Sequence, residues 1–225
     1  MIKLVAFDLD GTLLQPDGSI SEEDKQALKE AAAKGVELVV STGRPYAGVP
    51  KVVEDLGFHY AITTNGAAVY TYPGKELVYE NCLDREIALT MISTMRDLSV
   101  YPDSFVDGNG WGYEEKKAMI DNLELPLGIR TYMKKTRLFK EDVVKTIVDE
   151  DKNVQKITVD FILDEEGNPK DYEKVKQLFL DCPLVDMVSG GVLNLEVTKK
   201  GVNKGVALQM LAKTGNWNRR NYGNW

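Results

Sequence analysis

The sequence predicts an α/β protein with a Rossmann-like parallel-sheet core and an inserted α+β domain. Three observations lead to this prediction. Short apolar runs at residues 2–6, 36–40 and 60–64 each lead, within two residues, into a stretch with polar residues and glycine. Helical stretches separate these runs, as in alternating strand and helix units. From about residue 84 the texture changes, and residues 156–163 partly alternate polar and apolar side chains, as in a sheet with one open face.

The elements of the predicted core follow from capping and turn residues. Ser21 and three acids after it begin a helix that ends at Gly35, and a second helix over 46–56 ends at Gly57. Pro73-Gly74 separates 69–72 from 76–79, which predicts a hairpin. A strand at 193–197 and a helix at 206–213 complete a core of residues 1–83 and 191–225.

The inserted domain is predicted to span residues 84–190. Its expected helices are 86–98, 114–123, 141–151 and 171–180, and its expected strands are 100–106, 156–163 and 185–189. Four aromatic residues surround the Gly-Asn-Gly turn at 108–110, and they either line a substrate entrance or pack in the core, which is the commoner role of aromatic side chains. These residues are Tyr101, Phe105, Trp111 and Tyr113.

Composition excludes several classes of function. The 225 residues carry 28 Lys and Arg against 35 Asp and Glu, and the net charge of -7 argues against a nucleic-acid-binding surface. Two distant cysteines fit neither a metal site nor a disulfide framework, and a single histidine, His59, excludes mechanisms that need a pair. With no signal peptide and no membrane-length apolar run, we expect a cytoplasmic protein without a membrane partner.

The first candidate site is the run Phe7 to Thr12, which follows the first apolar strand. The period of two in an extended strand places Asp8 and Asp10 on one side and Leu9 on the other. In open α/β sheets ligands bind beyond the carboxyl ends of the strands, where two close carboxylates suit a hard cation such as Mg²⁺. An ordinary Asp-Gly turn after a strand is the alternative.

Two further stretches also follow strand ends. Thr42, Gly43 and Arg44 offer a hydroxyl, backbone N–H groups and a bidentate guanidinium to a phosphate, unless the hydroxyl is only a helix cap and Arg44 is solvated. Asn65 and Gly66 follow the third strand, where Asn65 either contacts a ligand or only adopts the left-handed turn that Asn-Gly favours.

Lys204 is the last candidate, because it lies at the start of the 206–213 helix. A lysine in the first turn is unfavourable with respect to the helix dipole, so a nearby anion would explain it, although surface lysines are common.

Carboxylates with a cation, a hydroxyl with an arginine, and a lysine together suit phosphoryl transfer, in which a carboxylate nucleophile can form an acyl-phosphate.

At this point the sequence resembles a known family, the haloacid dehalogenase superfamily of phosphatases, and within it the Cof-type (subfamily IIB) sugar-phosphate phosphatases, which carry a large α/β cap. The first motif is matched by residues 8–12, the second by 41–44 and the third by 201–205, and Asn65-Gly66 matches a further signature. The resemblance extends from residue 2 to about residue 213. It implies a cap that closes over the leaving group and sets specificity.

The resemblance also implies roles for individual residues. Asp8 would be the nucleophile, Asp10 the general acid and base, Thr42 a phosphate ligand, and Lys204 the group that holds Asp8 and the phosphate together. Mg²⁺ would lie between Asp8, the carbonyl of Asp10 and a carboxylate of a fourth motif. The remaining residues expected around the phosphate or substrate are Leu9, Gly11, Gly43, Arg44, Asn65, Gly66 and Asn203.

The resemblance breaks at residues 214–225. The family's fourth motif, Gly-Asp followed by Asn-Asp, is absent, and this stretch is rich in Asn, Gly and Trp without helical or strand periodicity. It is either a natural tail or the product of a frameshift, because its permitted codons, read one nucleotide later, can spell a segment expected before the fourth-motif acid. Loss of that acid would weaken Mg²⁺ binding.

The sequence therefore predicts a Mg²⁺-dependent phosphatase of small phosphorylated metabolites, such as sugar phosphates, that acts through an aspartyl-phosphate and is impaired by loss of the fourth motif. The alternatives are a phosphomutase of the same superfamily and a non-catalytic sugar-phosphate-binding remnant. The specific substrate and the oligomeric state are not predicted.

Overall fold

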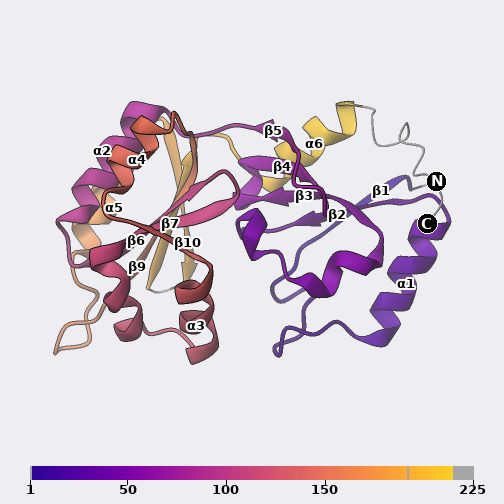
Figure 1. Ribbon diagram of the computed structural model, residues 1–225, viewed down its shortest axis with the longest axis horizontal. Coiled ribbons are helices and arrows are strands. Elements are labelled where there is room, and N and C mark those ends of the chain that lie inside the picture. Colours follow the sequence, from indigo (N-terminus) through magenta and orange to yellow (C-terminus); the bar gives the residue numbers. More distant parts are fainter. Residues whose placement is uncertain (1, 192, 215–225) are drawn as a thin grey trace. The chain divides into compact units, whose positions relative to one another are not determined.

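A computed structural model describes residues 2–191 and 193–214. The described residues divide into two compact units, the first formed by residues 2–80 and 203–214, and the second by residues 81–191 and 193–202 (Figure 1). Among the described residues, no helix is long and apolar enough to cross a membrane. Of the tail at residues 214–225, interpreted above as natural or frameshifted, Thr214 ends a helix and residues 215–225 lie outside the described residues.

The first unit is a five-stranded sheet in the order β1-β2-β3-β4-β5. Its first three strands are parallel, and the last two continue the sheet antiparallel, which confirms the predicted α/β class and the predicted hairpin. The strands are β1 (Leu4–Phe7), β2 (Glu37–Ser41), β3 (Phe58–Thr63), β4 (Ala68–Thr71) and β5 (Leu77–Glu80). The helices are α1 (Glu22–Ala33) and α6 (Lys204–Thr214), with short 3-10 helices η1 (Tyr46–Gly48), η2 (Lys51–Leu56) and η3 (Thr64–Gly66).

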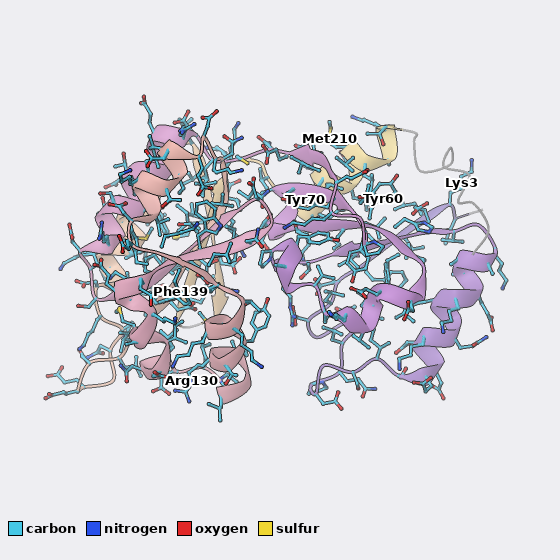
Figure 2. The ribbon with its side chains drawn as sticks, viewed as in Figure 1. Lys3, Tyr60, Tyr70, Arg130, Phe139 and Met210 are labelled. Atoms are coloured by element: carbon cyan, nitrogen blue, oxygen red, sulfur yellow. The ribbon has the colours of Figure 1, made fainter. Side chains whose placement is uncertain are left out.

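Alternate side chains of the buried strand β2 pack in two different clusters. Leu38 and Val40 belong to the cluster that includes Leu28 of α1, whereas Val39 belongs to the cluster that includes Leu211 of α6. Because successive side chains of a strand point to opposite faces, α1 and α6 cover opposite faces of this sheet. Met210 of α6, labelled in Figure 2, is exposed. The sheet is thus covered on both faces, as a parallel sheet requires.

The prediction of a single helix over residues 46–56 is wrong. The segment forms η1 and η2, separated by Val49 in extended conformation before Pro50. Proline has no N–H to donate, and it disfavours helical geometry in the residue before it. The chain therefore crosses this part of the unit in two short turns.

The second unit is a six-stranded sheet in the order β10-β11-β9-β6-β7-β8, antiparallel except for the β7–β8 pair. Its strands are β6 (Val100–Val106), β7 (Asn109–Tyr113), β8 (Leu138–Lys140), β9 (Val154–Phe161), β10 (Val185–Gly191) and β11 (Asn194–Lys199). Its helices are α2 (Arg85–Arg96), α3 (Leu127–Thr136), α4 (Val143–Asp149), α5 (Tyr172–Leu180) and the 3-10 helix η4 (Glu114–Asn122). Helices α2, α4 and α5 contribute residues to one large apolar cluster with the sheet.

Strand β11 corrects the sequence-based assignment of residues 191–202 to the core. It pairs antiparallel with β9 on one side and β10 on the other, and Leu195 and Val197 pack in the apolar cluster of the second unit. Periodicity identifies a strand but not its neighbours, so this strand was assigned to the wrong sheet. The aromatic residues around the 108–110 turn are nearly fully buried, which favours their packing role.

Candidate active site

Three polar stretches lie at one end of the five-stranded sheet. Because β1, β2 and β3 are parallel, the residues that follow them emerge at the same edge. Asp8 follows β1, Thr42 follows β2 and Thr64 follows β3. Strand β1 ends at Phe7, so residues 8–10 do not continue it as an extended strand, but Leu9 is fully buried in the apolar cluster while Asp10 is exposed. Any contact between Leu9 and a phosphate would therefore involve its backbone.

Lys204 lies against Asp8. Its Nζ atom is 2.5 Å from Asp8 Oδ1, and both side chains are a little over one-third exposed. Lys204 is the first residue of α6, where the positive end of the helix dipole disfavours a cation. The carboxylate of Asp8 is the anion that offsets this cost. The site therefore joins residues 196 positions apart in the sequence.

Arg44 binds Asp10 through a two-pronged contact. Its Nε atom donates to Asp10 Oδ2 at 2.9 Å and its Nη2 atom to Oδ1 at 2.6 Å, while Nη1 donates to the carbonyl of Gly48 at 3.0 Å. This fork is the geometry in which arginine binds carboxylates and phosphates. The fork of Arg44 is thus bound by Asp10, although a third of the arginine side chain remains exposed. Sequence reasoning missed Gly48, for which no pattern signals a carbonyl aimed at Arg44.

The loop after β2 is fastened by backbone hydrogen bonds. Thr42 is almost completely buried, and its Oγ1 atom accepts a hydrogen bond from the backbone N–H of Arg44 at 3.2 Å. Its own N–H donates to the carbonyl of Ile62 at 2.9 Å. Thr42 therefore has a fixed place beside the strand ends, with its hydroxyl hydrogen still available as a donor. Gly43 lies between these two residues.

Asn203 and Gly66 meet at the start of α6. The Oδ1 atom of Asn203 accepts the N–H of Val206 at 2.9 Å, so Asn203 caps the helix that carries Lys204. Gly66 and Asn65 belong to η3, and both have positive φ. The left-handed turn expected for Asn65 is confirmed. Gly11 also has positive φ, at +73°, and a side chain there would meet no atom within 4 Å, so its freedom serves the turn after Asp10.

The formal charges of the acidic and basic side chains at this site sum to zero. Asp8 and Asp10 carry two negative charges, and Lys204 and Arg44 carry two positive ones. Within residues 2–191 and 193–214, no group of three or more His, Cys, Asp or Glu side chains is placed to hold a metal ion. Mg²⁺ is commonly bound by one or two carboxylates together with water and substrate phosphates, so the two acids fit it in part. A full all-protein set of ligands is not present in these residues.

Comparison with known families matches residues 5–222 to the family described as haloacid dehalogenase-like hydrolase. Phosphatase YwpJ of Bacillus subtilis is 32% identical over 121 residues, which cover 53% of this chain and 42% of YwpJ. The aligned part is therefore less than half of that relative.

Solved structures share the fold of this chain, and two of them are described here. A haloacid dehalogenase-like hydrolase from B. subtilis superposes with a TM-score of 0.76 at 25% identity, covering 96% of this chain and 79% of the other. The sugar phosphatase BT4131, described as a member of subclass IIB, gives a TM-score of 0.69 at 21% identity, over 95% and 76% of the two chains.

Proposed function

The chain belongs to the haloacid dehalogenase-like hydrolases, and on that premise we propose that it is a phosphatase that hydrolyses small phosphorylated metabolites with the help of Mg²⁺. The observation that carries the proposal is the pairing of Asp8 with Lys204 at the end of β1, 2.5 Å apart, at the sheet edge where the buried Thr42 follows β2. A partly exposed carboxylate at a strand end, next to a fixed cation and a hydroxyl, can both attack and hold a phosphate.

The chemistry of these residues divides into two steps. In the first, an Oδ atom of Asp8 attacks phosphorus, the bond to the leaving oxygen breaks, and Asp10 gives that oxygen a proton. In the second, Asp10 takes a proton from water, whose oxygen attacks phosphorus, and the acyl-phosphate bond breaks to release phosphate and restore Asp8. Lys204 and Thr42 neutralise and orient the phosphoryl oxygens. Mg²⁺, which Asp8 and Asp10 would hold, would neutralise further charge on the phosphate.

Arg44 has a second task in this proposal. Its fork now binds Asp10, and an incoming phosphate would compete for the same donors because both anions fit the guanidinium. Arg44 therefore orients Asp10 before substrate arrives and borders the phosphate afterwards. Asn65 and Gly43 lie in the two loops that flank this position, and we assign them to the substrate rim.

We propose that the second unit, residues 81–202, is the cap that covers the leaving group. Residues 81–202 replace the range 84–190 predicted for the cap from the sequence, because β10 and β11 belong to the sheet of the second unit. Sugar phosphates are the proposed substrates, supported by the fold shared with the sugar phosphatase BT4131. The cytoplasmic location remains a prediction from the sequence.

A non-catalytic sugar-phosphate-binding protein is the second candidate. The observation that favours it is the absence of a third metal-binding carboxylate among the described residues. Such a protein would be stabilised against heat by a phosphorylated ligand but would not release phosphate.

The test is Mg²⁺-dependent release of inorganic phosphate from p-nitrophenyl phosphate and from a panel of sugar phosphates. We expect Asp8→Asn to lower kcat by about 1,000-fold or more, because the nucleophile is removed. Asp55→Asn, a matched change at an exposed acid of η2, should leave kcat unchanged. Ligand-induced stabilisation without phosphate release would support the binding protein, and conversion of a sugar phosphate to its isomer would indicate a phosphomutase.

A further inference from the structure

The turn η3 has an unusual backbone. Thr64, Asn65 and Gly66 have φ values of 49°, 60° and 102°, so three successive residues have positive φ. Thr64 is β-branched, a class for which positive φ is sterically costly. It is fully buried, and among the described residues its Oγ1 atom has no hydrogen-bond partner. The side chain therefore offers no hydrogen bond that would explain the strained backbone.

One side of this turn is bonded to the loop after β2. The N–H of Thr64 donates to the carbonyl of Arg44 at 2.9 Å, and the N–H of Asn65 donates to the carbonyl of Thr42 at 3.3 Å. The carbonyl of Thr64 accepts the N–H of Ala67 at 3.1 Å, which closes the turn. The strained conformation thus directs two consecutive N–H groups at the loop that carries Thr42 and Arg44.

The other side of the turn abuts the start of α6. A Cβ atom added to Gly66 would lie 2.4 Å from the carbonyl oxygen of Asn203, 2.5 Å from its carbonyl carbon and 2.8 Å from the backbone nitrogen of Lys204. All three are backbone atoms, which cannot move aside by changing a rotamer. Glycine is therefore required here by a close backbone approach as well as by its positive φ.

We propose that the turn Thr64–Gly66 is a positioning element that sets Lys204 at its distance from Asp8 and from the loop of Thr42 and Arg44. Gly66 is then a positioning residue that acts through Lys204, and the inference rests on the proposed function. Strained residues persist only where the surrounding structure determines them, and here both neighbouring loops do so. The spacing is set by backbone contact, so it does not depend on flexible side chains.

Gly66→Ala is the direct test. Contacts of 3.4 Å are ordinary, so a Cβ at 2.4 Å forces the α6 start away by about 1 Å. Displacement of a catalytic group by that amount can cost about 100-fold in rate, so we expect kcat for p-nitrophenyl phosphate to fall by about 100-fold and KM to change much less. Amide exchange at Val206 and Ala207, which both bond to Asn203, should accelerate about tenfold.

Gly35→Ala is the matched control. Gly35 has a φ of +77° in the same unit, but an added Cβ meets nothing within 4 Å. Both variants place an alanine at positive φ, which is destabilising, but only Gly66→Ala introduces a steric clash with the start of α6. If the two variants give the same kcat and the same exchange at residues 206 and 207, the proposal is overturned.

A double variant separates positioning from general destabilisation. If Gly66 acts through Lys204, Gly66→Ala should cost little further activity once Lys204→Met has removed the ammonium group. Additive losses would contradict the proposal. Should Gly66→Ala not fold, Thr64→Gly replaces it, since glycine accepts the same φ but loosens the turn; wild-type exchange at residues 206 and 207 in that variant would then overturn the proposal.

The exchange measurement also distinguishes this proposal from the proposed function. If the natural sequence releases no phosphate, the proposed function fails, while faster exchange in Gly66→Ala alone would still support positioning. If the natural sequence is active and Gly66→Ala matches Gly35→Ala in every measurement, the positioning role fails and the phosphatase stands.

Discussion

The ion pair between Asp103 and Arg137 is predicted to be the costliest single contact to break in the second unit. Arg137 Nε lies 2.6 Å from Asp103 Oδ2, and the two side chains are only 9% and 1% exposed. The hydroxyl of Tyr101 donates to the other oxygen of Asp103 at 3.2 Å. Burial disfavours the charge on Arg137, but the adjacent carboxylate outweighs this effect and raises the pKa of Arg137 above its ordinary value.

We expect Asp103→Asn to leave Arg137 charged and buried without a counter-ion. Breaking one partner of a buried pair costs about 3–5 kcal/mol, so the free energy of unfolding should fall by about 3 kcal/mol or more. For a chain of this length that corresponds to a decrease of about 6–12 °C in Tm. Urea unfolding followed by circular dichroism measures the change.

Asp149→Asn is the control. Asp149 pairs with Lys145 on the exposed side of α4, where both side chains are more than half exposed. Such a pair contributes about 0.5 kcal/mol or less. Replacing the buried pair as a whole, by Asp103→Leu with Arg137→Met, should recover most of the loss because no unpaired charge remains. The reasoning is refuted if Asp103→Asn costs no more than Asp149→Asn.

Three further predictions concern pH, metal and capping. Burial raises the pKa of Asp160 from 3.8 to about 7, so between these values the folded chain keeps a proton that the unfolded chain has lost. The free energy of unfolding should therefore fall as pH rises through this range, by up to about 4 kcal/mol, and Asp160→Asn should flatten the fall in a urea series across pH. Mg²⁺ should raise the Tm of the natural sequence but not of Asp8→Asn, and EDTA should abolish phosphate release; equal Tm shifts would place the ion elsewhere. Ser21→Ala removes the oxygen that accepts the N–H of Asp24 at 3.0 Å and should cost about 1 kcal/mol in urea unfolding, whereas a loss near zero would show that the cap is dispensable.

Local sequence patterns predicted much of the first unit. The apolar runs became β1, β2 and β3, the acids of the first motif emerged at the end of β1, and the hairpin formed where Pro73-Gly74 indicated it. These features depend on residues close together in the chain. Their hydrophobic periodicity and turn residues can be recognised in the sequence without knowledge of the tertiary structure. The two carboxylates and Lys204 were named as candidates for the same reason.

Contacts between residues far apart in the sequence could not be predicted in this way. The sequence could not show that β11 completes the sheet of the second unit, because a strand's periodicity is the same whichever neighbours it finds. Helix α3 was missed entirely, and the helix expected after Arg44 was interrupted at Pro50. Pairing and packing partners are decided when distant segments meet.

The sequence by itself determined which groups can do chemistry here: two acids, a hydroxyl, an arginine and a lysine, each next to a strand or helix end. Only the tertiary structure decided how they are used. It brought Lys204 to Asp8 across 196 positions, gave the fork of Arg44 to Asp10, and brought Gly66 against the backbone of Asn203. The physical reason is that charge pairing and backbone contact depend on distances of a few ångströms, which the parallel sheet and α6 set and which residue order alone does not encode.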